Sequence, residues 1–184
     1  CWKSGWQIVW NRLNNKDGPS DGLQEVDSNM KFSTREDIEA PIDYVFARIT
    51  DFDGFEKQAM RRGTDMQRTD NAAVPGEGSA WDIAFKFRGK DRRLNAKIAR
   101  LDAPNEMQLT TVANGLDGNT SVELVALSRA RTRISVAIEL KPQSLSARLL
   151  LQSLKLAKSN LTRKFKIRVA DFAEGVEESY SKSV

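Results

Sequence analysis

The stretch ISVAIELKPQSLSARLLLQSLKLAKSNLTRKF, residues 134–165, contains the transition that decides the fold. Up to Leu140, apolar and polar residues alternate, which is typical of a strand with one buried face. After Pro142, apolar residues recur every three or four positions, which predicts a helix with Ser144 as a candidate N-cap. The predicted apolar stripe consists of Leu145, Leu149, Leu150, Leu154, Leu161, Phe165, Val169, Phe172 and Val176.

This helix is expected to be one continuous rod of about 30 residues, about 45 Å long, with Gly175 ending or fraying it. A strand of about ten residues is about 33 Å long, so the helix can cross a whole sheet. Its apolar stripe must be buried, and the inner face of the sheet is the available partner.

The segments upstream of the helix alternate in the same way as residues 134–140 and predict strands. The alternating segments are residues 81–88, 94–99, 107–111 and 122–126, with connections expected at 89–91, 103–105, 116–119 and 129–131. Connections this short leave no room for crossover helices, so the strands should pair antiparallel with their sequence neighbours.

The segment before these strands predicts one strand, two short helices and a further edge strand. Residues 31–39 read as the first strand, and Pro41 suits the start of a helix. Asp53 is a candidate cap for a second helix through about Arg62, and residues 65–70 read as a short strand. The chain therefore predicts an α+β domain over residues 30–180, with six or seven strands and one long closing helix.

Residues 1–29 differ from the rest of the chain, because they hold three of the four tryptophans, followed by a breaker-rich linker. Trp2, Trp6 and Trp10 recur near helical spacing, which fits a short amphipathic anchor for a partner or a membrane surface. The alternative, which we favour, is that Met30 is the native start and that residues 1–29 are a disordered or non-native N-terminal extension.

Composition excludes several classes of function. The 184 residues carry a net charge of +4 with 25 acidic residues, which does not describe a polybasic nucleic-acid binder. Histidine is absent and Cys1 is the single cysteine, so histidine-based triads, histidine-containing zinc sites and intramolecular disulfides are excluded. Asp51 and Asp53 lack the other ligands of a calcium loop. We expect no cofactor and no metal, while a carboxylate, lysine or tyrosine mechanism remains open.

The sequence also predicts a location. No stretch approaches the roughly 18 apolar residues of a membrane span, and the N-terminus lacks the basic and apolar regions of a signal peptide. A cytoplasmic protein is the expectation.

Over about residues 30–180 the chain resembles the START-like superfamily, also called SRPBCC, which includes polyketide cyclase/dehydrase-type proteins. FSTREDIEAPIDYVFARITDFDGFEKQ (32–58) resembles the opening strand and helices of the family, and GEGSAWDIAF (76–85) its glycine turn entering a strand. SLSARLLLQSLKLAKSNLTRKF (144–165) resembles the closing helix, and the similarity is greatest to uncharacterised bacterial members.

The resemblance implies a helix-grip fold, in which a curved antiparallel sheet wraps around the last helix and encloses an apolar cavity. Members bind lipids, sterols, polyketides, quinones or plant hormones, and some are enzymes, without an invariant catalytic set. The Rieske-linked oxygenases of the superfamily use histidine ligands, so the absence of histidine excludes that branch.

Alternation and helical spacing select seven candidate ligand-binding residues, which either line a cavity or form a plain packed core. They are Trp81, Phe85, Met107, Leu109, Leu124, Leu150 and Leu154. Phe85, Leu109 and Leu154 are expected to converge on the cavity. Asp82, Glu123 and Glu139 are expected on the opposite face of the sheet, and Tyr44 is the one tyrosine expected within the core.

The predicted helix is also biased in charge, because no acidic residue occurs from Gln143 to Ala170. This basic face is either simply solvated or a patch for an anionic membrane or an acidic protein, with nucleic acid ranked lower because no stacking aromatics accompany it. The candidate patch residues are Arg148, Lys155, Lys158, Arg163 and Lys164.

Three hypotheses of function follow. The first is a carrier or sensor of a small hydrophobic molecule, such as a lipid, polyketide or quinone-like compound. The second is a cyclase or dehydratase-type enzyme that uses a cavity carboxylate or tyrosine. The third is a protein- or membrane-interaction module that acts through the basic helix.

Overall fold

The computed structural model describes residues 29–61, 63–87 and 90–183, except for the side chains of Phe85, Phe87, Lys90 and Arg92. Residues 1–28 lie outside the described residues, so both interpretations of that segment remain predictions. The described elements are β1 (Met30–Ile38), α2 (Ile42–Ile49), α3 (Phe52–Arg61), β2 (Thr64–Arg68), β3 (Ala80–Phe87), β4 (Lys90–Asp102), β5 (Glu106–Ala113), β6 (Leu116–Ser128), β7 (Arg131–Pro142), α4 (Leu145–Lys155) and α5 (Lys158–Ser181).

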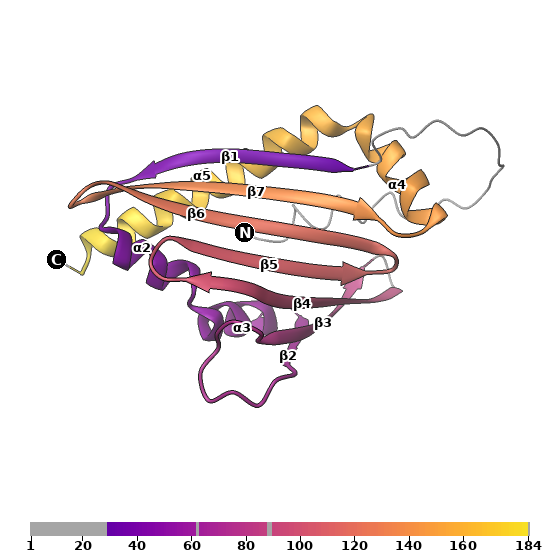
Figure 1. Cartoon of the computed structure of the whole chain (residues 1–184), viewed down its shortest axis with the longest axis horizontal. Coiled ribbons are helices and arrows are strands. Elements are labelled where there is room, and N and C mark those ends of the chain that lie inside the picture. The colour runs from indigo at the N-terminus through magenta and orange to yellow at the C-terminus, as the bar shows by residue number, and fades with distance from the viewer. Residues whose placement is uncertain (1–28, 62, 88–89, 184) are drawn as a thin grey trace.

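The seven strands within the described residues form one antiparallel sheet in the order β1-β7-β6-β5-β4-β3-β2. From β2 to β7 every strand pairs with its sequence neighbour, as the short connections predict. The first strand, β1, instead pairs with the last strand, β7, from Met30↔Leu140 to Ile38↔Thr132. The helices lie on one side of this sheet (Figure 1), which confirms the predicted helix-grip fold.

The two short helices begin close to the expected positions, but the predicted cap of the second is wrong. Pro41 precedes α2 with a φ of −60°, as expected for a proline at a helix start. Asp51, and not Asp53, caps α3, because its Oδ1 accepts a hydrogen bond from the Gly54 N–H at 3.0 Å. A Cβ on Gly54 would lie 2.2 Å from Asp51 Oδ2, so glycine permits this close cap.

The turn between β5 and β6 also differs from the prediction. Residues 116–119 are part of β6, and the turn is made by Asn114 and Gly115, with φ values of 47° and 74°. Positive φ at both central residues is the signature of the tight turn that Asn-Gly favours in two-residue hairpins. The predicted connection at 103–105 is confirmed, and that at 129–131 is one residue shorter because Arg131 begins β7. The prediction at 89–91 is wrong for Lys90 and Asp91, which begin β4 and pair with Phe87 and Lys86, and Gly89 lies outside the described residues.

The closing helix is broken, contrary to the prediction of one continuous rod. Ser144 caps α4 as predicted, since its Oγ accepts a hydrogen bond from the Ala147 N–H at 3.2 Å. The chain leaves helical pairing at Leu156 and Ala157 and restarts as α5, which continues through Gly175 to Ser181. Leu161 follows Leu154 by seven residues, which is about two helical turns, and both are buried. The spacing of apolar residues is therefore the same as in a continuous helix, so the sequence pattern could not show the break.

None of the described helices is both long and apolar enough to cross a membrane.

Candidate functional site

The register of the strands assigns every strand residue to one of two faces. We call the face turned toward the helices the inner face. It carries Met30 and Phe32 of β1, which pack with residues of α4 and α5, and the alternate residues Ser33 and Arg35 point to the opposite, outer face.

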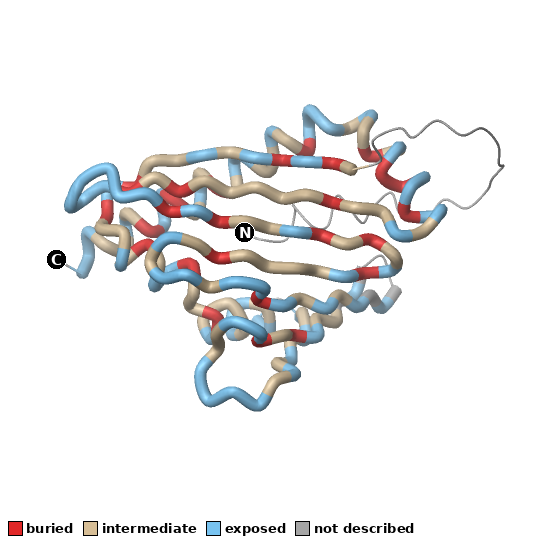
Figure 2. Tube along the Cα trace, in the orientation of Figure 1, coloured by how far each residue is buried: buried red, intermediate tan, exposed pale blue. Residues whose placement is uncertain are grey.

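Buried residues of the inner face form two separate clusters, one toward each end of the strands (Figure 2). The α2-end cluster consists of Ile38, Ala40, Val45, Ile49, Phe52, Trp81, Ile98, Met107, Val122, Leu124, Ile134, Ala173 and Val176. The α4-end cluster consists of Met30, Phe32, Leu116, Leu140, Ala147, Leu150, Leu151, Leu154 and Leu161.

Between the clusters, a strip of the inner face is only half-buried. On β7 this strip lies between Ile134 of the α2-end cluster and Leu140 of the α4-end cluster. Register continues it across neighbouring strands, because Ile138 pairs with Thr120 and Thr120 with Leu109. We call these residues the central strip: Thr34, Leu109, Thr111, Thr120, Val136 and Ile138.

Gly118 shapes one edge of the central strip. This glycine is buried, pairs with Thr111 across β5 and β6, and has a carbonyl oxygen 3.4 Å from Thr111 Oγ1. A Cβ at Gly118 would lie 2.4 Å from that Oγ1 and 3.4 Å from Leu140 Cδ2. Any larger residue would therefore push the threonine away, and glycine keeps the hydroxyl in place on the inner face.

The seven residues predicted from the sequence are divided among these regions. Leu109 lies in the central strip, while Leu150 and Leu154 belong to the α4-end cluster. The side chain of Phe85 lies outside the described residues. The remaining three, Trp81, Met107 and Leu124, belong to the α2-end cluster. Leu109 of β5 packs against the α2-end cluster, and Leu154 of α4 belongs to the α4-end cluster, so the two do not share a cluster.

Trp81 is held by contacts that sequence reasoning did not find. Its Nε1 donates to Glu56 Oε1 at 2.5 Å, and its ring lies 5.2 Å from the ring of Phe52. Both partners come from α3, which covers this end of the sheet.

Sequence reasoning also missed Thr34, Thr111 and Thr120, although they occupy the same alternating positions as the apolar residues and could have been found by extending that register.

The predicted acid–base candidates do not form a catalytic group. Asp82 and Glu123 are exposed, as expected, and half-buried Glu139 pairs with Lys31 at 3.4 Å and Lys141 at 3.5 Å. The Tyr44 hydroxyl lies 2.8 Å from Ser179 Oγ, where it joins α2 to α5.

Among the described residues, two carboxyl groups have perturbed pKa values, and in both the pKa is lowered. The Arg133 guanidinium donates to Asp37 at 2.6 Å, which lowers the pKa of that carboxyl, and Arg131 adds to the effect. Arg68 donates to Asp70 at 3.0 Å and likewise holds the pKa of Asp70 well below its usual range. A general acid at neutral pH needs a raised pKa, so neither group is suited to that role.

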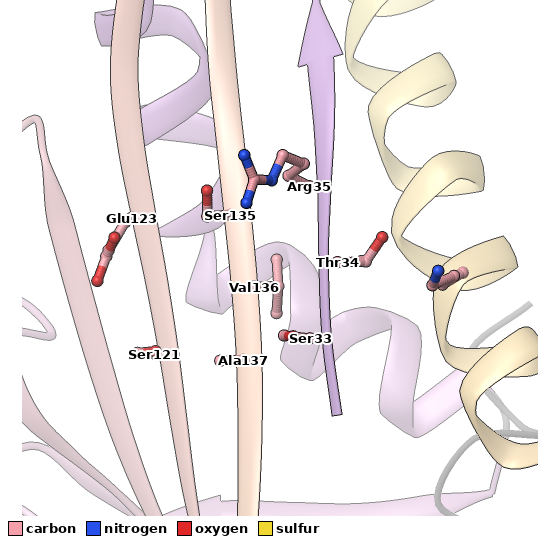
Figure 3. A pocket seen from close by; sticks show the side chains of 9 residues that line it. Ser33, Thr34, Arg35, Ser121, Glu123, Ser135, Val136 and Ala137 are labelled. Carbon is pink, nitrogen blue, oxygen red and sulfur yellow. The ribbon is translucent and has the colours of Figure 1, made fainter. Parts of the chain in front are cut away.

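A polar hollow of about 410 Å³ lies over β1, β7 and β6 (Figure 3). Arg35 and Glu123 flank Ser135 in it, since both pair with this serine in the register. Its residues are Ser33, Thr34, Arg35, Ser121, Glu123, Ser135, Val136, Ala137 and Lys166. Register turns Ser33, Arg35, Ser121, Glu123, Ser135 and Ala137 to the outer face, while Thr34 and Val136 also belong to the central strip. The mostly polar lining of the hollow differs from the apolar lining typical of a hydrophobic-ligand site.

Comparison with solved structures identifies the fold. An aromatase/cyclase from Streptomyces has a TM-score of 0.56 at 11% identity, covering 81% of this chain and 94% of that one. Norcoclaurine synthase from Thalictrum flavum, solved with dopamine and hydroxybenzaldehyde, has a TM-score of 0.58 at 10% identity, covering 91% and 98%. A START superfamily protein from Mycobacterium smegmatis has a TM-score of 0.53 at 10% identity, covering 82% and 98%. No protein-family model and no curated protein matches the sequence.

Proposed function

The chain has the START-like fold, and we propose that its inner face binds a small, largely hydrophobic molecule at the central strip. The observation that carries this proposal is the half-burial of the strip between two fully buried clusters. A sheet face packed only for stability would be expected to bury its centre more completely than its ends. Here the ends are buried and the centre is half-buried, with Leu109 and Val136 packed against the α2-end cluster and Ile138 against the α4-end cluster. Under the proposal, a ligand covers the part of the centre that remains exposed.

The chemistry of the strip suggests the class of ligand. Leu109, Val136 and Ile138 provide an apolar surface, and the threonines of the strip provide hydroxyl groups that can donate or accept. A mostly apolar lining with a few placed polar groups is typical of small-molecule sites. The ligand would be uncharged and mostly apolar, with one or two hydroxyl or carbonyl groups, as in a lipid, polyketide or quinone-like compound.

The structural neighbours agree with this class in general terms. One is an aromatase/cyclase, and another was solved with hydroxybenzaldehyde, an uncharged aromatic molecule with hydroxyl and carbonyl groups, and with dopamine, which carries an amine in addition to its hydroxyl groups. Under this proposal, the predicted residues Trp81, Met107 and Leu124 form one wall of the site, and Leu150 and Leu154 the other.

The test is to fill the central strip by replacing Leu109 with tryptophan. If the strip is open, Leu109→Trp should weaken binding of anilinonaphthalene sulfonate about tenfold and leave stability nearly unchanged. Val112→Trp is the matched control, because Val112 lies on the same strand but is exposed, at 52%. Native mass spectrometry of the purified protein would show in addition whether a ligand co-purifies.

Two results would contradict the proposal. The first is a wild-type protein that binds neither the dye nor a co-purifying molecule. The second is a Leu109→Trp variant destabilised by about 1–3 kcal/mol, the cost of overpacking a core that has no free space.

One observation favours the catalytic alternative. Glu36 pairs with Ile134 on the inner face, two residues from Thr34, and is half-buried. Among the described residues its carboxylate has no hydrogen bond or ion pair, so it is available to contact a bound molecule. An enzyme of the dehydratase kind would release water from a co-purified ligand over time, and Glu36→Gln would stop that change without abolishing binding.

A further inference from the structure

We infer that the corner between α4 and α5 docks on an anionic membrane surface. Three leucines follow one side of α4 up to this corner, and we call Leu145, Leu149 and Leu156 the leucine ridge; they are 76%, 60% and 87% exposed. The sequence pattern predicted Leu145 and Leu149 within the buried stripe, and that prediction is wrong. Within the described structure, packing in the core therefore does not explain why these three positions are leucine.

Helical geometry places the ridge on one side of α4. At about 100° per residue, Leu145 and Leu149 lie on one side of the helix, and buried Leu151 and Leu154 on the other. Leu156 follows Leu149 by seven residues, about two turns, and extends the ridge to the end of the helix. The opposite side of α4 belongs to the α4-end cluster, so the ridge can be occupied without disturbing the core.

Positive charge accompanies the ridge. Arg148 lies next to it on α4 and is exposed, and Lys158 is exposed at the start of α5. Lys155 and Lys164 are half-buried, Arg163 is exposed, and no acidic residue occurs anywhere from Gln143 to Ala170. The two helices thus combine an exposed apolar line with several cations and carry no acidic residue before Asp171. The Asp117 carboxylate of β6 accepts a hydrogen bond from Gln143, just before α4, at 2.7 Å.

This combination selects an anionic lipid surface over a second copy of the chain. Apolar side chains can enter the headgroup boundary while neighbouring cations attract anionic lipid, which is how interfacial helices bind. In a dimer through the ridge, by contrast, the same cations would approach each other and repel. The inference is independent of the proposed ligand, because the ridge and the central strip share no residue.

The test is sedimentation of the full chain with vesicles. We expect binding to phosphatidylcholine vesicles that contain about one third phosphatidylserine, weakening as salt rises, and little binding to phosphatidylcholine alone. The double variant Leu149→Ser/Leu156→Ser should lower affinity at least about tenfold. Arg148→Gln/Lys158→Gln should lower it by roughly fivefold per removed cation.

Matched controls come from the outer face of the sheet. Val112 and Val125 are 52% and 54% exposed, so Val112→Ser/Val125→Ser removes a comparable apolar surface from another place. Arg93 and Lys97 are exposed on β4, and Arg93→Gln/Lys97→Gln removes two cations there. Neither control should change vesicle binding, and all variants should keep the wild-type thermal midpoint because every changed residue is exposed.

Several outcomes would overturn the inference. Equal binding to both kinds of vesicle, absence of binding, or equal loss in the control variants would each do so. Loss only in a full-length Trp2→Ser/Trp6→Ser/Trp10→Ser variant would assign membrane binding to the N-terminal tryptophans. A wild-type dimer in analytical ultracentrifugation that the ridge variant converts to monomer would show that the ridge is a self-association surface. Binding to an acidic polypeptide but not to vesicles would assign it to a protein partner.

Discussion

The two ends of the inner face use similar side chains in different ways. At the α2 end, α2 contacts β6, β7 and α5, and apolar residues from both helices, including Val45, Ile49, Ala173 and Val176, are buried together. At the α4 end, α4 contacts β7 and buries Leu150, Leu151 and Leu154, but leaves the leucine ridge exposed.

The difference shows that the number of covering elements, and not the number of leucines, decides what is buried. The α2 end receives residues of three helices, because Phe52 of α3 is buried in the same cluster as residues of α2 and α5. At the α4 end the helix covers the sheet with one side, and within the described residues its other side has no layer above it. An excess of apolar residues at such a position is available for a partner.

The largest expected effect on stability is the difference between a buried and an exposed leucine of α4. Leu151 is fully buried, so Leu151→Ala should lower the free energy of unfolding by about 2–5 kcal/mol, through lost burial and the cavity that remains. Leu149→Ala should change it by less than about 0.5 kcal/mol, because this residue is exposed. Urea denaturation of both variants measures the difference, and equal losses would mean that the ridge is covered in solution.

A smaller effect is expected at the α2 end, from the contact that joins α2 to α5. Tyr44→Phe removes the hydroxyl that lies 2.8 Å from Ser179 Oγ and keeps the ring, which lies 4.9 Å from that of Tyr180. The loss should be about 0.5–1.5 kcal/mol, the net contribution of one hydrogen bond. In a double-mutant cycle, Ser179→Ala should add little to Tyr44→Phe, and full additivity would show that the two hydroxyl groups do not interact.

The smallest expected effect is a change in the pH dependence of stability, caused by the ion pairs between β1 and β7. The Asp37 carboxylate receives hydrogen bonds from Arg133 and Arg131, and the pKa of Asp37 is therefore lower in the folded chain than in the unfolded one. A lowered folded pKa contributes stability above the unfolded value, about 3.9, that is lost as the pH falls through and below it.

Thermal midpoints measured from neutral pH down to acid should accordingly show a fall near and below pH of about 4 that is smaller in Asp37→Asn. The groups that face this carboxylate are the two arginines, and Arg131 is shared with Glu39 at 3.2 Å. Because all four groups are partly exposed, added salt should reduce the effect. An unchanged pH profile in Asp37→Asn would contradict this account.

Much of the fold could be predicted because it depends on local patterns. Alternation identified the strands from β3 to β7, short connections predicted that these strands pair with their neighbours, and the change of period after Pro142 predicted the closing helix with Ser144 as its cap. The Asn114–Gly115 turn was also readable, since positive φ is what this dipeptide favours, and placing it at 116–119 was an error of interpretation.

The candidate site was less predictable, although the sequence correctly indicated which strand residues face the helices. Alternation placed Trp81, Met107, Leu109 and Leu124 on the inner face, where the structure has them. It did not distinguish the half-buried centre from the buried ends, and so passed over Thr34, Thr111 and Thr120. A residue's parity within a strand is a local property, whereas its depth depends on which helix lies above it.

The sequence by itself thus determined the order of elements, the inner and outer residues of the strands from β3 to β7, and the absence of histidine chemistry. Only the tertiary structure decided the pairing of β1 with β7, the break at Leu156 and Ala157, the division of the core and the exposure of the leucine ridge. The physical reason is that hydrophobic periodicity reports which side of an element is apolar. What covers that side is decided by segments that are distant in the chain and meet only in the folded protein.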